Sequence, residues 1–250
     1  MGPSKTKFTP PPRMSFLEKQ AIADAKVSLI LEFLSDGEIY TDVAVTSCLL
    51  GSSLSSARRT LKRMVKEYSL KTETHLVRSR ACQIYGISTQ GVALSGNFDC
   101  RPFELGKTNP SFITHHLKTQ KARLAAIDHG WTDWVPERSI HGKGYLKVPD
   151  ALVTNSEGFR VAVEIELNIK TTKRYSEICS AHLQSIAKGH WHEVHYLCPE
   201  KLLAGVERIF AGIEFVSVKG DRVSIQQKHR QRFKFFCLDA WPIALQKDTL

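Results

Sequence analysis

Residues 160–170, RVAVEIELNIK, decide the fold that we predict for this chain. Branched aliphatic residues occupy every odd position of this stretch, whereas the even positions carry Ala, Asn or charged residues. This alternation predicts a β-strand with one apolar face in a core and a second face outside it. On the second face Glu164 and Glu166 point the same way, about 6.6 Å apart along the strand. Two such carboxylates repel each other unless a cation lies between them, so the strand is a candidate metal site.

A second apolar run, residues 147–153 (KVPDALV), lies just upstream and is joined to the first by the turn-forming sequence Asn-Ser-Glu-Gly. The two runs predict a β-hairpin. A five-residue loop, 155–159, places Asp150 opposite Glu164 on the same face, whereas a four-residue loop places it opposite Val163. A metal site therefore requires the longer loop or a bulge. An ordinary hairpin with a solvated outer face fits either loop.

The composition indicates a globular protein with a polyanionic partner. A chain of 250 residues, 42% of them hydrophobic, can form one large domain or two small ones with buried cores. The formal net charge of +10 favours nucleic acid as the partner. The six cysteines are scattered, and the first residues are polar and Pro-rich, which predicts reduced thiols in a cytoplasmic protein. No run approaches the roughly 20 apolar residues of a membrane span, so no membrane insertion is expected.

The N-terminal part, residues 14–95, predicts a winged helix-turn-helix that follows a disordered basic arm at 1–13. Three helices are expected before two strands, 70–77 and 82–88, which are separated by a basic turn. The third helix has a cationic side and an apolar side. The apolar side is expected to contain Leu54, Ala57, Leu61, Met64, Val65 and Tyr68.

Lys and Arg far outnumber acids in the third helix and the hairpin after it, which predicts a face that neutralises DNA phosphates. A solvated helix face or a protein-contact surface is the alternative. The candidate DNA-binding residues are Arg58, Arg59, Lys62, Arg63, Lys66, Arg78 and Arg80.

The C-terminal part, residues 111–250, predicts a second domain after a Gly- and Pro-rich linker at 96–110. Its first helix is expected at 111–129, with Ile113, Leu117, Leu124 and Ile127 on its core stripe. A strand near 131–138, the hairpin, a helix opened by Thr171 and Thr172, a strand at 192–198, and a short helix and strand near 213–218 follow. A basic stretch, 219–234, completes the pattern, so the fold class is α+β or α/β.

The acidic pattern resembles the PD-(D/E)XK nuclease superfamily, in the variant where a second acid replaces the usual Lys. Asp150 follows Pro149 at a strand start, and Glu164-x-Glu166 lies on an apolar strand. With the winged helix ahead and Lys173 behind, the chain is most similar to plasmid replication-relaxation proteins, in particular mobilisation relaxases of the MobC type. The similarity covers about residues 14–240.

This resemblance implies a restriction-endonuclease-like mixed sheet and cleavage of one strand at a plasmid transfer origin in the bacterial cytoplasm. An accessory mobilisation protein and the conjugative secretion machinery are the implied partners. Mg²⁺ or Mn²⁺ is the implied cofactor, since hard oxygen ligands suit these ions. Asp150 and Glu164 would hold the metal with the carbonyl of Ile165. Glu166 would orient or deprotonate the attacking water, or hold a second metal.

Other candidates surround this centre. The missing positive charge is expected from Lys173, with Lys170 as the alternative. Glu137 lies near the strand before the hairpin, where some superfamily members carry another acid, although a surface Glu fits equally well. His115 and His116 lie on the leading helix, and one of them could reach the scissile phosphate.

Two other functions stay open. Residues 190–192, His-Trp-His, match the metal-binding pattern of relaxases and replication initiators with a Tyr nucleophile, for which Tyr175 or Tyr196 would serve. The helical apolar stripe around Tyr175 instead predicts its burial, and this function leaves the acidic strand unexplained. The second alternative is a non-enzymatic winged-helix regulator of plasmid replication or partition.

Overall fold

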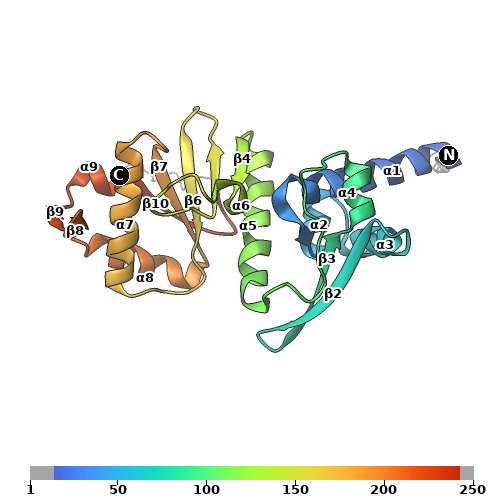
Figure 1. Cartoon of the computed structure of the whole chain (residues 1–250), viewed down its shortest axis with the longest axis horizontal. Helices are drawn as coiled ribbons and strands as arrows, with labels where there is room; N and C mark the ends of the chain where they lie inside the picture. Colours follow the sequence, from blue (N-terminus) through green and yellow to red (C-terminus); the bar gives the residue numbers. More distant parts are fainter. Residues whose placement is uncertain (1–13, 243–250) are drawn as a thin grey trace, which may run out of the picture.

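The computed structural model describes residues 14–242, so the arm predicted at 1–13 lies outside it. The chain is a mixed α+β protein, as predicted. Figure 1 shows two lobes, each built on its own sheet, with the long helix α5 between them. In the described part of the chain, no helix is long and apolar enough to cross a membrane.

The N-terminal lobe has helices packed on a small sheet of order β1-β3-β2. Its helices are α1 (Phe16–Phe33), the π-helical turn η1 (Leu34–Glu38), α2 (Val43–Leu49), α3 (Leu54–Lys66) and α4 (Thr89–Ser95). Its strands are β1 (Tyr40–Thr41), β2 (Leu70–Val77) and β3 (Arg80–Ile87). Asp42 and Ser53 cap α2 and α3 through their side chains, which accept hydrogen bonds from Val45 N–H and Ser56 N–H.

Strands β2 and β3 form a hairpin with a two-residue turn. Both turn residues, Arg78 and Ser79, have positive φ angles, 49° and 63°. This turn geometry matches the right-handed twist of the strands, and the pairing continues to the turn, where Val77 pairs with Arg80. The pairing of Val77 with Arg80 starts β3 two residues earlier than predicted.

The C-terminal lobe is built on a five-stranded sheet of order β10-β7-β6-β5-β4. Its strands are β4 (Thr132–Pro136), β5 (Ala151–Thr154), β6 (Arg160–Ile165), β7 (Glu193–Cys198) and β10 (Phe233–Cys237), and β8 (Phe215–Val218) and β9 (Asp221–Ser224) form a separate hairpin. Its helices are α5 (Pro110–Asp128), α6 (Glu137–Ile140), α7 (Thr172–Ala187), α8 (Glu200–Ala211) and α9 (Gln227–Arg230). Strands β4, β5 and β6 are antiparallel, whereas β6, β7 and β10 are parallel.

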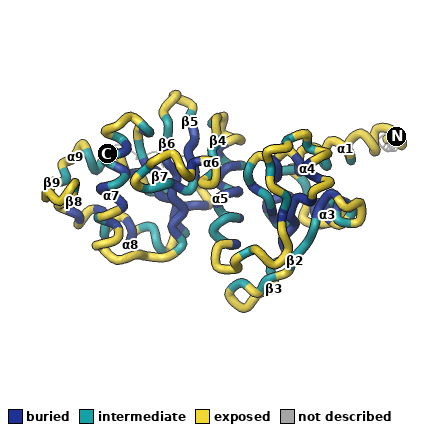
Figure 2. Tube along the Cα trace, viewed as in Figure 1, coloured by how far each residue is buried: buried dark blue, intermediate teal, exposed yellow. Residues whose placement is uncertain are grey.

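The expectation that β6 has only one buried face is wrong. Val161 and Val163 pack against Ala122 of α5, whereas Ala162 packs in the core beneath α7. Glu164, on the Ala162 face, is only 8% exposed. The reason is topological: β6 lies between β5 and β7 and is covered by a helix on each side. Figure 2 shows the resulting dark-blue buried centre of this lobe.

The hairpin has the longer of the two loops considered, with five residues. Thr154 pairs with Arg160 and Ala151 with Val163, which leaves residues 155–159 as the loop. Continuing this register by one step places Asp150 opposite Glu164, the arrangement that a shared site requires.

The predicted linker packs onto the N-terminal lobe. Phe103 is 3% exposed, and its N–H donates to the carbonyl of Ile87 at 2.7 Å. A Cβ on Gly86 would lie 2.0 Å from the Phe103 ring, so this approach requires glycine. Helix α5 belongs to both lobes, because Ile113 lies in the N-terminal core and Ala122 in the C-terminal core.

Some predicted core positions are wrong. Leu54 is 53% exposed because it opens α3, and Tyr68 is 76% exposed because it lies beyond the helix end. Ile127 is 50% exposed near the end of α5. The sequence prediction also missed β10, which lies partly within the basic stretch 219–234 and pairs with β7.

Candidate active site

A cleft of about 580 Å³ opens where β6 ends, and it collects the acidic residues that the sequence singled out. Asp150, Glu164 and Glu166 all line it, together with Ile165. The first turn of α5 and the tip of the β2–β3 hairpin contribute the opposite walls. Residues from both lobes therefore surround the carboxylates.

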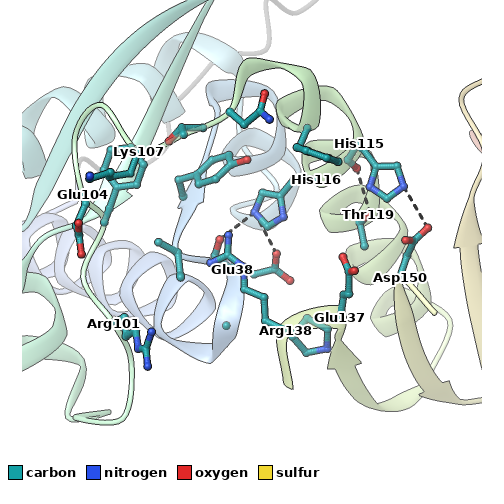
Figure 3. Close-up of a pocket in the computed structure, with 18 of the residues that line it drawn as sticks. Glu38, Arg101, Glu104, Lys107, His115, His116, Thr119, Glu137, Arg138 and Asp150 are labelled. Atoms are coloured by element: carbon teal, nitrogen blue, oxygen red, sulfur yellow. Dashed lines mark hydrogen bonds and ion pairs between the residues drawn. The ribbon is translucent and has the colours of Figure 1, made fainter. Parts of the chain in front are cut away.

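Asp150 and the Ile165 carbonyl share one partner, His115. The Ile165 N–H donates to Asp150 Oδ2 at 2.7 Å, and His115 Nε2 lies 3.1 Å from that same oxygen. His115 Nε2 also lies 3.1 Å from the Ile165 carbonyl oxygen. Burial opposes protonation of His115, but the Asp150 carboxylate and the carbonyl outweigh it and raise the pKa above its ordinary value. Figure 3 shows the His115–Asp150 contact.

Glu164 is an ionised carboxylate inside the protein. Lys147 Nζ lies 2.7 Å from Glu164 Oε1, and His182 Nε2 of α7 lies 3.1 Å from it. Burial alone would raise the pKa of Glu164, but Lys147 and His182 overcome this and lower it to about 2. Burial likewise opposes the charge on Lys147, yet Glu164 keeps the pKa of that amine above its ordinary value.

Glu166 follows the last residue of β6 and is 4% exposed. Its carboxylate pairs with Lys170, and its N–H donates to the Leu197 carbonyl at 3.0 Å, which continues the β6–β7 ladder. The predicted burial of Tyr175 is confirmed, because this side chain is 0% exposed beside Glu166. Burial raises the pKa of the Tyr175 hydroxyl.

Tyr196 of β7 also lines the cleft and is 1% exposed. Its hydroxyl has no hydrogen-bond partner within residues 14–242. Burial raises its pKa well above the ordinary value, with the neighbouring carboxylates acting in the same direction. The hydroxyl therefore keeps its proton.

Four of the candidate catalytic residues lie outside the lining of the carboxylate cleft, and the buried Tyr175 is one of them. Lys173 lines a separate depression with Ser176 and Ser180. Glu137 opens α6, is half exposed, and pairs with His141 at 3.3 Å. His116 lies 2.9 Å from the Glu38 carbonyl, and burial lowers its pKa, which is typical of a neutral packing histidine.

A neighbouring chamber of about 500 Å³ lies between the lobes and shares Phe112, His115 and Asp150 with the cleft (Figure 3). Arg101 and Lys107 reach it from the segment before α5, and Arg138 reaches it from α6. His115 and Asp150 therefore stand at a boundary between two spaces, both of which carry cations.

The candidate DNA-binding residues fall into two groups. All but one are exposed, on α3 or on the hairpin: Arg58, Arg59, Lys62, Lys66, Arg78 and Arg80. Arg63 instead turns toward α1, where its guanidinium donates to the Ala23 carbonyl at 3.2 Å. Arg78, at the hairpin tip, also lines the carboxylate cleft.

The sequence prediction missed two residues of the site, Lys147 and His182. For His182 a signal existed, because it lies on the helical stripe of Ile178 and Cys179, whose side chains are buried. For Lys147 no periodic signal existed, since it precedes β5 in an irregular segment. Its role depends on how that segment folds over the end of β6.

The oxygen donors of the site suit Mg²⁺ or Mn²⁺: two carboxylates, Asp150 and Glu164, and the Ile165 carbonyl. Each already contacts a nitrogen of His115 or Lys147, with which a metal would compete. Across residues 14–242, no three Asp, Glu, His or Cys side chains form a ready-made metal-binding group. The donor chemistry fits the ion, and its presence stays a prediction.

The His-Trp-His stretch does not line the carboxylate cleft, although Trp191 packs against His182 with 5.6 Å between the ring centroids. Trp191 is buried, His190 packs against Tyr145, and His192 accepts a hydrogen bond from the Arg160 N–H at 3.0 Å. No protein-family model, curated protein or solved structure matches the chain. The cleft geometry is therefore the basis for assigning a function.

Proposed function

We propose that the chain is a metal-dependent DNA endonuclease that nicks one strand of a plasmid transfer origin. The observation that carries this proposal is the meeting of Asp150, Glu164 and Glu166 with Lys147 and Lys170 around one cleft. Phosphodiester hydrolysis of this kind needs carboxylates that hold a metal ion and positively charged side chains that hold the phosphate. The accessory mobilisation protein and the secretion machinery belong to the same proposal.

The element order supports this assignment in both lobes. Helix α5, the antiparallel strands β4 to β6, helix α7 and the parallel strand β7 follow the order expected of a restriction-endonuclease-like core. In the N-terminal lobe three helices precede the β2–β3 hairpin, the order expected of a winged helix. We assign duplex binding to this lobe, through the exposed cations of α3 and the hairpin.

The carboxylates of the cleft, the Ile165 carbonyl and the two lysines each have a role in the proposed reaction. Asp150, Glu164 and the Ile165 carbonyl would hold Mg²⁺ or Mn²⁺, which when bound supplies an activated water and stabilises charge on the phosphate. Glu166, held by Lys170, orients the water or accepts its proton. Lys147, which lines the cleft and pairs with Glu164, would supply a positive charge to the scissile phosphate.

The tyrosines favour hydrolysis over a covalent protein–DNA link. Tyr175 and Tyr196 are both buried, and burial raises the pKa of both hydroxyls, so neither is an exposed or activated nucleophile. The regulator alternative shares the DNA-binding surface and differs by lacking strand cleavage.

The test is strand cleavage of a supercoiled plasmid that carries the DNA flanking this chain's coding sequence, here called the test plasmid. We expect conversion to open circles with Mg²⁺ or Mn²⁺, little conversion with chelator, and little conversion of the parent vector. Denaturing gels of end-labelled products should show no protein attached to the strand. An intact test plasmid under all ion conditions would favour the regulator, and an attached protein would favour a Tyr nucleophile.

A further inference from the structure

Two exposed apolar side chains stand at the rim of the carboxylate cleft. Leu76, at the hairpin tip, is 76% exposed, and Phe112, in the first turn of α5, is 65% exposed. Both line the same cleft as Glu164 and Glu166. Contact of this leucine and phenylalanine with another apolar surface would remove them from water and lower the free energy.

The hairpin that carries Leu76 is held in place by its other face. Glu73 accepts a hydrogen bond from the Gly106 N–H at 3.0 Å, and Lys71 Nζ donates to the Phe103 carbonyl at 3.4 Å. Val77 packs against the N-terminal core. Side chains alternate along a strand, so Leu76 lies on the opposite side from these anchors. The apolar tip is therefore supported from behind.

Cations flank this apolar rim. Arg78 lies next to it in the turn, and Lys170 and Arg174 line the cleft beyond it. Glu164 and Glu166 are each less than 10% exposed, so a phosphate has to enter the cleft to reach them. Leu76 and Phe112 line the same cleft and are far more exposed than these carboxylates, so a paired duplex that approaches the cleft meets them before its phosphates reach the acids.

We propose that Leu76 and Phe112 open the duplex at the mouth of the cleft, with Leu76 as a wedge between base steps and Phe112 as a stacking surface for an unpaired base. Leucine and phenylalanine are among the side chains that proteins insert between base steps. An aromatic face stacks with any base, and Arg78 holds the backbone beside it. This inference rests on the proposed function for its ligand, DNA.

The first test measures opening without cleavage. The test plasmid is bound by wild-type protein in the presence of chelator and treated with permanganate, which oxidises unstacked thymines. We expect a short cluster of reactive thymines with wild type and its loss with Leu76→Ser. Leu94→Ser, at a 62% exposed position of α4 outside the cleft, is the matched control and should keep the cluster. An absent wild-type cluster, or an unchanged one in Leu76→Ser, would overturn the proposal.

The second test separates opening from binding and chemistry. Leu76→Ser should nick the supercoiled test plasmid about tenfold more slowly than wild type. Its rate of cleavage of a single-stranded oligonucleotide of the same sequence should change by less than about twofold. Equal losses on both substrates would contradict a wedge. If wild type cleaves neither substrate, the proposed nuclease function fails, and the permanganate pattern still decides whether the rim opens DNA.

Discussion

Glu164 is the central residue of the candidate site. Its buried carboxylate is kept ionised by the side chains of Lys147 and His182. Lys147 and His182 both contact the same oxygen, Oε1. Removing one member of such a group leaves a poorly compensated charge, so these residues affect stability as well as chemistry. The sequence motif identified the acid and placed the missing positive charge on Lys173, with Lys170 as the alternative. Lys173 lines another depression, whereas Lys170 lines the cleft and pairs with Glu166.

Replacing Lys147 and Lys173 by methionine, one at a time, tests which lysine supplies the positive charge of the site. We predict that Lys147→Met lowers nicking of the test plasmid roughly 100-fold, because a positive charge directed at the phosphate is removed. Lys173→Met is the matched control and should keep nicking within about twofold, since its side chain lies outside the cleft. Rates are compared per folded protein, after circular dichroism confirms the folded fraction. Equal losses in the two variants would contradict the assignment to Lys147.

A second residue, Glu193, predicts a pH dependence of stability. Burial opposes its charge, but His195 and Lys234, each 2.7 Å away, lower its pKa from 4.5 to about 2. A lowered folded-state pKa stabilises the protein above pH 4.5, and this contribution is lost as pH falls toward 2. Glu193→Gln should therefore lower the free energy of unfolding by about 1–2 kcal/mol at pH 7, after allowance for solvent screening.

Urea unfolding of wild type and Glu193→Gln at several pH values measures this difference. It should shrink below pH 4.5 and be smallest near pH 2. Glu177→Gln, in an exposed pair with Arg174, should show no comparable difference at any pH. A gap that stays constant with pH would mean that the effect is not electrostatic.

At the scale of single elements, α3 has two kinds of arginine. Arg58 and Arg59 extend into solvent, whereas Arg63 bonds to the backbone of α1 at Ala23. The cationic side of the helix was predictable from spacing alone, because helical periodicity places these residues on one side. The contact between Arg63 and α1 was not predictable from spacing, because it depends on how α1 packs beside α3.

We predict that the double variant Arg58→Ala/Arg59→Ala weakens binding to the test DNA. The salt slope of log affinity should fall by about one unit for each phosphate that the variant no longer neutralises. Fluorescence anisotropy at several salt concentrations measures both quantities. Arg63→Ala should instead lower the melting temperature, with a smaller change in salt slope. Unchanged affinity in the double variant would assign α3 a role other than DNA binding.

Local signals explain most of what the sequence predicted correctly. Strand alternation and turn chemistry predicted the hairpin, and Thr171 marked the start of α7 as its capping residue. The five-residue loop was required only if Asp150 and Glu164 share a site. The two buried faces of β6 and the added strand β10 depend on partners far along the chain, which periodicity does not reveal. The contact between His115 and Asp150 also joins residues that are far apart along the chain, so periodicity did not reveal it.

For the whole molecule, α5 is the shared element. Its first half completes the N-terminal core through Ile113 and Leu117, and its second half covers the five-stranded sheet. Phe103 ties the preceding segment to the same lobe. The two lobes are therefore joined by packing as well as by the chain, and a boundary at residues 96–110 would divide a common core.

This packing predicts how fragments behave. A fragment of residues 14–129 keeps Phe103, Ile113 and Leu117, whereas a fragment of 14–95 lacks all three buried side chains. We expect the shorter fragment to melt roughly 10 °C or more below the longer one, or not to fold, because each missing core side chain costs several kcal/mol. Calorimetry of both fragments measures this. Equal melting temperatures would show that α5 is not part of the N-terminal core.

The measurement that tests the central claim most directly is the nicking rate of Glu164→Gln on the test plasmid in Mn²⁺. Glutamine keeps the shape of the side chain and removes the charge that would hold a cation. We predict a loss of roughly 1000-fold or more with DNA affinity within about twofold of wild type, and no loss in the exposed control Glu177→Gln. Nicking by Glu164→Gln at the wild-type rate would contradict the account.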